Sequence, residues 1–192
     1  MEDTPTREAV VPRLRGRFGH QYTFVERTPS TQHLLPPDAP GGAVAVADEQ
    51  TEGRGRLGRR WEVAAGTSVL CSVQLLPAAD ASRFPQLTLV GAEACADAIR
   101  AVTGLDPTLK HPNDVLIGGR KVAGLLGEST DGRVVLGAGI NVNVPADELP
   151  VDLRIPATSL LAELGEPADR IELLVVFLAA LERRYDSWLE TK

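Results

Sequence analysis

Aromatic residues and cysteines are scarce in this sequence of 192 residues. Aromatic side chains make up 4% of the chain, so the hydrophobic core has to be built from aliphatic residues, and the few aromatic residues are expected at chosen positions. The two cysteines, Cys71 and Cys95, stand within apolar stretches. They predict buried thiols in a reducing compartment, and not a disulfide framework.

Long apolar runs and an excess of positive charge are also missing. No apolar stretch is long enough to cross a bilayer, and the opening residues 1–5 are polar where a secretory signal peptide has an apolar segment. The formal net charge is −6, which argues against a surface that binds nucleic acid or anionic membranes as a whole. The sequence therefore predicts a cytoplasmic protein without DNA or membrane partners, in which any anion-binding site is local.

The side-chain sets of nucleophilic and redox catalysis do not stand out either. The three histidines, His20, His33 and His111, are scattered, and there is no evident Ser/His/Asp set or CxxC pair. Each histidine is interpreted as structural or exposed. The expected chemistry therefore needs no protein nucleophile and no tightly held metal.

The apolar patterns that are present fit one domain of α+β class. The first 20 residues are polar and predict an N-terminal arm or an edge element ahead of a domain over residues 21–192. Gly118-Gly119 and Asp131-Gly132 predict two adjacent hairpins and hence antiparallel pairing. The expected fold is a mixed, mostly antiparallel sheet with helices packed on one face. Helices are expected over 85–102, 158–165 and 167–189, and strands over 22–26, 42–48, 67–76, 108–110, 115–117, 121–128 and 133–142.

Nine residues from Gly53 to Trp61, the arginine loop, hold four arginines and three glycines. Glycine lets the backbone approach a ligand closely, and arginine offers a planar charged fork that suits phosphate and carboxylate oxygens. The loop thus predicts a cationic lid over an anion, anchored by Trp61; a solvated basic turn is the plainer alternative. If only a bound anion offsets the repulsion among the arginines, residues 53–59 are expected to be poorly ordered without ligand.

Four further segments supply polar side chains at strand and helix ends. Lys110–Asp114 closes a strand with a Pro-Asn-Asp turn, in which Asp114 can hold a hydrated Mg²⁺ and an Asx turn is the structural alternative. Lys121 stands in an apolar strand near Gly124, where a ligand can lie against the backbone; edge protection is the alternative. The other two segments are Gly137–Asn143, a strand that ends in two asparagines, and Ser30–Gln32 at the start of a short helix.

In this order and spacing the segments resemble the catalytic domain of the biotin–protein ligases, the biotin–[acetyl-CoA-carboxylase] ligase family, of monofunctional type. The resemblance covers roughly residues 20–190. It implies the fold that this family shares with class II aminoacyl-tRNA synthetases. It also implies a two-step reaction, in which ATP, Mg²⁺ and biotin give biotinyl-5′-AMP. A lysine on a biotin carboxyl carrier domain of an acyl-CoA or pyruvate carboxylase then accepts the biotinyl group.

The resemblance implies a role for each matching residue. Lys121, Arg54 and Arg56 are the implied catalytic residues, and Lys121 bridges the biotin carboxylate and the α-phosphate. Trp61 is expected to stack near the adenine, Asn141 to bond its edge and Gly124 to let the biotin ring lie close. Asp114 is the implied Mg²⁺ ligand. The implied biotin, ATP and adenylate contacts are Ser30, Thr31, Gln32, Gln50, Gly53, Arg54, Gly55, Arg56, Trp61, Asn113, Lys121, Gly124 and Asn141.

The sequence departs from the family pattern at two of these segments. Gln32 stands where the family usually has Asn, and His111 stands where Trp is usual. A C-terminal small β-barrel and the DNA-binding domain of bifunctional members are expected to be absent, so a repressor role is not expected. Two other functions stay open: a lipoate– or octanoate–protein ligase, and a biotin-binding module with little turnover. Monomer and homodimer are both compatible with the sequence.

Overall fold

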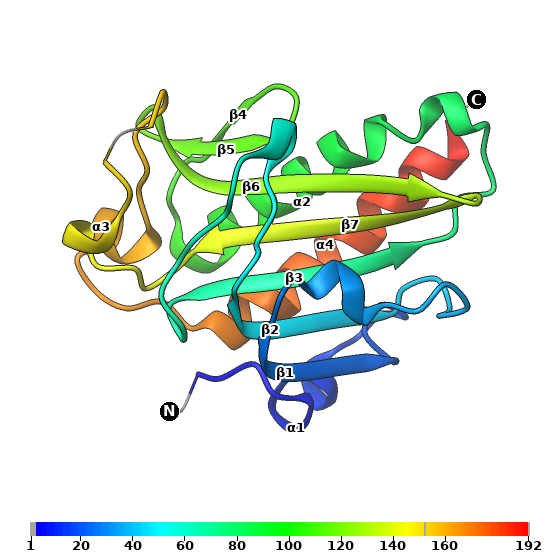
Figure 1. The fold of residues 1–192 in the computed structure, drawn as a ribbon, viewed down its shortest axis with the longest axis horizontal. Coiled ribbons are helices and arrows are strands. Elements are labelled where there is room, and N and C mark those ends of the chain that lie inside the picture. Colours follow the sequence, from blue (N-terminus) through cyan, green and yellow to red (C-terminus); the bar gives the residue numbers. More distant parts are fainter. Residues whose placement is uncertain (1–2, 152, 192) are drawn as a thin grey trace.

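A computed structural model describes residues 3–151 and 153–191, and one seven-stranded sheet forms its centre (Figure 1). The order across the sheet is β1-β2-β3-β7-β6-β5-β4, and every neighbouring pair is antiparallel except β1 with β2. The expected mixed, mostly antiparallel sheet is confirmed. The strands are β1 (Tyr22–Thr28), β2 (Val44–Gln50), β3 (Ser68–Leu75), β4 (Thr108–Lys110), β5 (Asp114–Ile117), β6 (Arg120–Thr130) and β7 (Arg133–Asn141).

Two long helices cover one face of the sheet, the far face in Figure 1. The helix α2 (Gln86–Thr103) ends at Gly104 in left-handed conformation, and α4 (Arg170–Glu190) begins where the Asp169 carboxylate accepts two backbone N–H bonds. Aliphatic side chains of both helices and of the covered sheet face form most of the main core. The short elements are α1 (Arg7–Val10), α3 (Leu160–Leu164), η1 (Val11–Arg13), η2 (Thr31–Leu34), η3 (Arg56–Gly58), η4 (Ala81–Arg83) and η5 (Ala146–Glu148).

The segment before β1, over which the sequence predicts a polar arm, packs against the rest of the domain in residues 3–20. Val10 and Phe18 are buried in the main core, and the Tyr22 hydroxyl donates to the Pro5 carbonyl at 2.7 Å. The fully buried Arg170 guanidinium of α4 donates to Asp3 and to Asp48 of β2. Contacts with distant parts of the chain hold this segment, and its polar composition does not reveal them.

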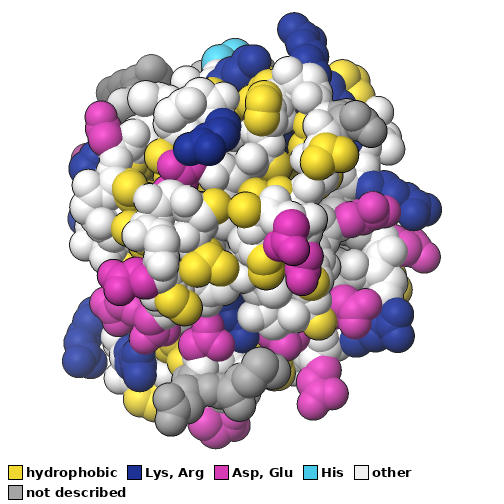
Figure 2. Space-filling view, turned by 90° about the vertical axis from the view of Figure 1, so that its left-hand side faces the viewer, with side chains coloured by type: hydrophobic (Ala, Val, Ile, Leu, Met, Phe, Trp, Pro, Cys, Tyr) yellow, Lys and Arg dark blue, Asp and Glu magenta, His cyan; other side chains and the backbone are white. Residues whose placement is uncertain are grey.

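The near face of the sheet is crossed by the arginine loop, which runs in front of β3, β7 and β6 in Figure 1. Figure 2 views the left-hand end of the molecule, where several Lys and Arg side chains lie along the upper edge and others lie among Asp and Glu side chains at the right-hand and lower edges. Hydrophobic side chains form small separate patches on this face. None of the described helices is long and apolar enough to span a membrane.

Candidate functional site

A cavity of about 660 Å³ lies on the near face of the sheet, among the arginine loop, η2 and the segment 150–157. This is the size of a small-molecule site. Gly53 lines a neighbouring hollow of about 620 Å³, which the arginine loop forms with Leu126 and Glu128. The cavity brings together the other predicted residues, which are Ser30, Thr31, Gln32, Gln50, Arg54, Gly55, Arg56, Trp61, Asn113, Asp114, Lys121, Gly124 and Asn141.

A bulge in β6 brings Lys121 and Gly124 to the cavity. Residues three apart on a regular strand point to opposite faces of a sheet. The register changes by one residue between the pairs Val115↔Ala123 and Leu116↔Lys121, which leaves Val122 as the extra residue on β6. Val122 and Ala123 are consequently both buried in the core. Because of this bulge, the lysine and the glycine can face the same ligand.

The Lys121 ammonium is paired with Asp114, with Nζ 2.6 Å from Oδ1 and side chains 21% and 15% exposed. An incoming carboxylate at Lys121 would meet the Asp114 charge unless a cation holds Asp114. The described residues contain no group of three or more His, Cys, Asp or Glu side chains that could hold a metal. Asp114 offers one carboxylate at the cavity, which fits an Mg²⁺ ion that water and nucleotide phosphates largely coordinate.

The end of the cavity formed by η2 is polar, and most of its polar groups form hydrogen bonds with one another. The Ser30 hydroxyl caps η2 by accepting from the Gln32 backbone N–H. The Thr31 backbone N–H and hydroxyl donate to Gln50 Oε1 at 2.8 and 3.1 Å, and Thr31 Oγ1 lies 2.7 Å from the Ser72 hydroxyl. These bonds fix the side chains before any ligand arrives.

Three buried polar atoms that line the cavity lack a hydrogen-bond partner within the described ranges: Gln32 Oε1, Asn141 Oδ1 and Trp61 Nε1. The Asn141 amide donates from Nδ2 to the Thr158 carbonyl at 2.9 Å, which leaves its oxygen as an acceptor. Unsatisfied buried polar atoms are uncommon in proteins. Their concentration in one cavity indicates a polar ligand that supplies both donors and acceptors.

The Trp61 indole lies on the floor of the cavity. Its ring is so close to β7 that a Cβ on Gly139 would lie 2.5 Å from Cε2, and a Cβ on Gly124 would lie 3.0 Å from Cζ3. The Lys121 ammonium lies 5.4 Å from the ring centroid. The indole therefore occupies the space beside Gly124 in which the family resemblance places the biotin ring. Stacking of Trp61 on adenine stays a prediction.

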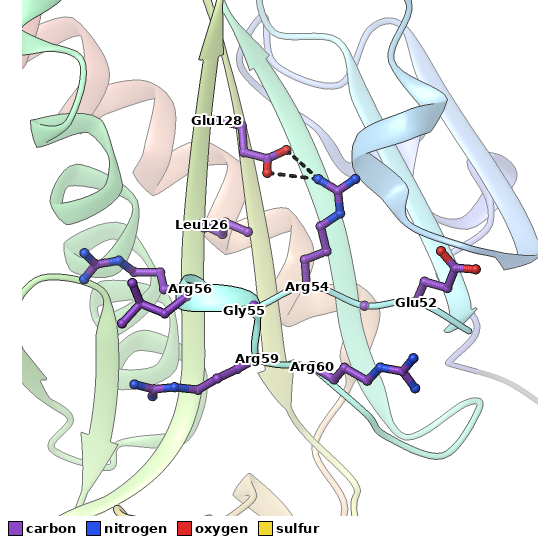
Figure 3. Close-up of a pocket in the computed structure, with 11 residues that line it drawn as sticks. Glu52, Arg54, Gly55, Arg56, Arg59, Arg60, Leu126 and Glu128 are labelled. Carbon is purple, nitrogen blue, oxygen red and sulfur yellow. Dashed lines mark hydrogen bonds and ion pairs between the residues drawn. The ribbon is translucent and has the colours of Figure 1, made fainter.

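The arginine loop has a carboxylate partner of its own (Figure 3). Arg54 donates to Glu128 of β6 at 3.1 and 3.4 Å, and its other nitrogen lies 3.0 Å from the His33 ring. In Figure 3 the Arg56 and Arg59 side chains extend away from this pair. The premise that only a bound anion offsets the repulsion in the loop is wrong, since Glu128 neutralises one of its arginines.

One cysteine, Cys71 of β3, stands beside the cavity with its side chain in the main core. Both thiols are buried as predicted, and burial raises the pKa of Cys71 to about 12. A thiol with this pKa stays protonated at neutral pH and is a poor nucleophile. Cys71 therefore contributes to the cavity wall and not to covalent chemistry.

Sequence reasoning missed several residues that shape the site. Ser72 supports Thr31, and Gly137 and Gly139, which lie in the predicted segment Gly137–Asn143 but were assigned no role of their own, line the cavity. Residues 153–157 pass beside Lys121, which donates its backbone N–H to the Pro156 carbonyl at 2.7 Å. Alternation along β7 could have indicated that Gly137, Gly139 and Asn141 share a face. The segment 150–157 carries no such signal, because its contact with β6 depends on chain folding over a long separation.

Comparison with known proteins gives concordant matches. The profile of the biotin/lipoate A/B protein ligase family matches residues 24–144. The chain is 39% identical over 171 residues to the bifunctional ligase/repressor BirA of Bacillus spizizenii, with 86% of this chain and 53% of that protein covered. It is 37% identical over 183 residues to the biotin–[acetyl-CoA-carboxylase] ligase of Mycobacterium tuberculosis, with 90% and 67% covered.

A solved structure agrees with these sequence matches. The biotin protein ligase of Aquifex aeolicus, in complex with biotin and ATP, has a TM-score of 0.81 and 33% identity to this chain, with 90% of this chain and 73% of that chain covered. The chain spans 53% and 60% of the length of the BirA proteins that it matches in Bacillus spizizenii and Bacillus subtilis. It is thus similar to a part of these relatives.

Proposed function

This chain belongs to the biotin/lipoate A/B protein ligase family, and from that premise we propose that it is a biotin–protein ligase. The reaction proposed is the activation of biotin by ATP to biotinyl-5′-AMP, followed by transfer of the biotinyl group to a lysine of a carrier domain. The observation that carries the proposal is one cavity that joins a buried polar end, a glycine-lined floor and the Lys121 ammonium.

In the first step a biotin carboxylate oxygen forms a bond to the α-phosphorus of ATP, and pyrophosphate leaves. Two anions have to approach each other, so the main requirement is neutralisation of charge and accurate positioning. Lys121 supplies a fixed positive charge on β6, and Arg54 and Arg56 supply further charge from the loop. Asp114 would hold Mg²⁺, which supplies neutralisation of the phosphate charge when bound.

In the second step the neutral amine of an acceptor lysine attacks the acyl carbon of the adenylate. The bond between that carbon and the phosphate oxygen breaks, AMP leaves with the electron pair, and the amine gives up a proton. Water can attack the same carbon, so a loop that covers the adenylate favours transfer over hydrolysis. We assign this covering role to the arginine loop.

The proposal favours biotin over lipoate or octanoate. The Aquifex aeolicus protein, which shares the fold at 33% identity, was solved with biotin and ATP. The family description itself includes lipoate ligases, so lipoate is the matched alternative substrate.

One assay tests these alternatives together. The protein is incubated with Mg²⁺-ATP and biotin, lipoate or octanoate, and both pyrophosphate release and acyl transfer to a carrier domain are measured. Biotin-dependent release and transfer are expected. Turnover with lipoate or octanoate in place of biotin would overturn the assignment, and biotin binding without pyrophosphate release would indicate a binding module.

Several parts of the proposal go beyond this reaction. We propose a biotin carboxyl carrier domain as the acceptor, because two relatives are named biotin–[acetyl-CoA-carboxylase] ligases. Cytoplasmic location, a monomeric or dimeric state and the lack of DNA binding stay predictions from the sequence.

A further inference from the structure

Lys121 lies at a point of the sheet where β6 pairs with only one of its two neighbouring strands. On one side Lys121 pairs with Leu116 of β5. On the other side the pairing of β6 with β7 begins at Ala123↔Ile140, two residues past Lys121. The edge of β6 that elsewhere faces β7 is therefore open to another segment at Lys121.

Residues 156–158, the strap, take the place of β7 at this point. Lys121 donates its backbone N–H to the Pro156 carbonyl at 2.7 Å and accepts the Thr158 N–H at its own carbonyl at 2.8 Å. Lys121 and Ala157 accordingly form an isolated parallel bridge. Both polar backbone groups of Lys121 are thus bonded to the strap, so the backbone that carries the ammonium depends on where the strap lies.

The strap is fastened in turn by a carboxylate of α3. The Thr158 hydroxyl donates to Glu163 Oε1, and Glu163 Oε2 accepts from Arg120, the residue before Lys121, at 2.9 Å. The Glu163 side chain is 10% exposed and lies outside the described lining of the cavity. Ser159 caps α3 through its hydroxyl, which fixes the helix that carries this carboxylate.

The two bonds of the Glu163 carboxylate differ in burial. Arg120 is 51% exposed, and exposed pairs of this kind contribute little. Thr158 is buried, and a hydrogen bond from a buried hydroxyl to a charged acceptor belongs to the stronger class. The bond to Thr158 is therefore the one that holds the strap.

We propose that Glu163 is a positioning residue for adenylation: through Thr158 it holds the strap against Lys121 and so fixes the ammonium that neutralises the reacting anions. This inference rests on the proposed function and adds a residue that lines no part of the described cavity. Electrostatic stabilisation depends on groups that are in place before the reaction. A misplacement of about 1 Å can lower a rate by about 10²-fold.

The first test removes the carboxylate with Glu163→Ala. The rate constant of biotin adenylation is measured in a single turnover at saturating biotin and Mg²⁺-ATP, and it should fall by about 10- to 100-fold. Glu163→Gln can still accept from the Thr158 hydroxyl and should restore the rate to within about fivefold of the original. Glu166→Ala, which removes an exposed carboxylate just after α3, is the matched control and should stay within about twofold.

The second test approaches the same bond from its other partner with Thr158→Val. This variant loses the hydroxyl, keeps Glu163 and should lose as much rate as Glu163→Ala. Combining the two changes should cost no more than either alone, because the same bond cannot be lost twice. In a Lys121→Ala background, Glu163→Ala should lower the remaining rate by no more than about twofold. A merely structural role would not produce this dependence on Lys121; circular dichroism at the assay temperature establishes that each variant is folded.

The outcomes separate this inference from the proposed function. Unchanged adenylation in Glu163→Ala or Thr158→Val would overturn the inference. So would an equal loss in Glu163→Gln and Glu163→Ala, or a loss from Glu163→Ala that is as large without Lys121 as with it. Each of these results, with normal adenylation by the original protein, removes the inference alone. If the original protein does not adenylate biotin, the proposed function fails and the inference fails with it.

Discussion

The two sides of the cavity satisfy their polar groups in opposite ways. At the η2 end the buried Thr31 and Ser72 and the half-buried Gln50 are held by mutual hydrogen bonds. On the arginine loop, Arg54 pairs with Glu128 through side chains that are 48% and 46% exposed. Exposed pairs of this kind contribute about 0–1 kcal/mol, so Arg54 can exchange partners at little cost. The molecule thus combines a fixed recognition end with a charged loop that can move.

The largest expected effect comes from removing the fixed charge between these two sides, with Lys121→Ala. The variant loses the ammonium and leaves Asp114 as an unpaired negative charge beside the substrate carboxylate. Biotin-dependent pyrophosphate release should fall by about 10²- to 10³-fold or more, as when a preorganised electrostatic contact is lost. Circular dichroism should show an intact fold.

The neighbouring Arg120→Ala serves as the matched control for the loss of a cation from β6. Arg120 pairs with Glu163 at 2.9 Å and is half exposed, away from the cavity lining. Its loss should change pyrophosphate release by no more than a few-fold. Equal rates of pyrophosphate release for Lys121→Ala and the original protein would show that Lys121 does not supply the catalytic charge.

The second prediction concerns Gly139→Ala, which alters the floor of the cavity at the Trp61 indole. A Cβ at this position would lie 2.5 Å from the Trp61 ring, so the indole has to leave the floor. Overpacking of this kind costs about 1–3 kcal/mol, and adenylate binding should weaken by about 5- to 150-fold. Trp61 fluorescence, recorded in a Trp188→Phe background, should change without ligand. Gly41→Ala is the control, since its Cβ meets no atom closer than 3.7 Å.

Unaltered Trp61 fluorescence in Gly139→Ala would mean that the indole does not rest on β7 in solution. The floor would then be open to ligand in the free protein. It could no longer be described as fixed in contrast to the movable loop.

A third prediction tests the ion pair at the border of the two sides through Asp114→Asn. Without the carboxylate, Lys121 keeps its charge unneutralised and should bind the biotin carboxylate more tightly in the absence of ATP and Mg²⁺. We expect a gain of about tenfold or less, measured by calorimetry, because the pair is partly exposed. The same variant should need more Mg²⁺ for adenylation. Weaker biotin binding would contradict the idea that Asp114 competes with substrate for Lys121.

Local patterns predicted most of the fold. The glycine turns at 118–119 and 131–132 and the alternation around them gave β5, β6 and β7 nearly to the residue. The helical spacing of apolar residues and the stop at Gly104 likewise predicted α2 nearly to the residue. These features depend on neighbours within a few positions, which is why sequence alone was sufficient.

The parts that sequence could not predict depend on long-range contacts. The bulge at Val122 puts Lys121 and Gly124 on one face, but its register is defined by β5. The residues before β1 join the core because Arg170 and Glu182 of α4 bind them, not because of their own composition. For the same reason the motifs predicted which residues line the cavity but not that the Trp61 indole lies on Gly139.

The smallest expected effect concerns the movable side, through Glu128→Gln. This change releases Arg54 from its carboxylate and should tighten adenylate binding by at most about fivefold, because exposed pairs contribute about 0–1 kcal/mol. The gain should vanish in 1 M salt, where the screening length falls to about 3 Å. Glu49→Gln is the matched control, since it breaks a similar surface pair with Arg27 on β1 and β2. A loss of affinity above tenfold in Glu128→Gln would mean that the Arg54–Glu128 pair is part of the bound state, and that the loop is as fixed as the η2 end.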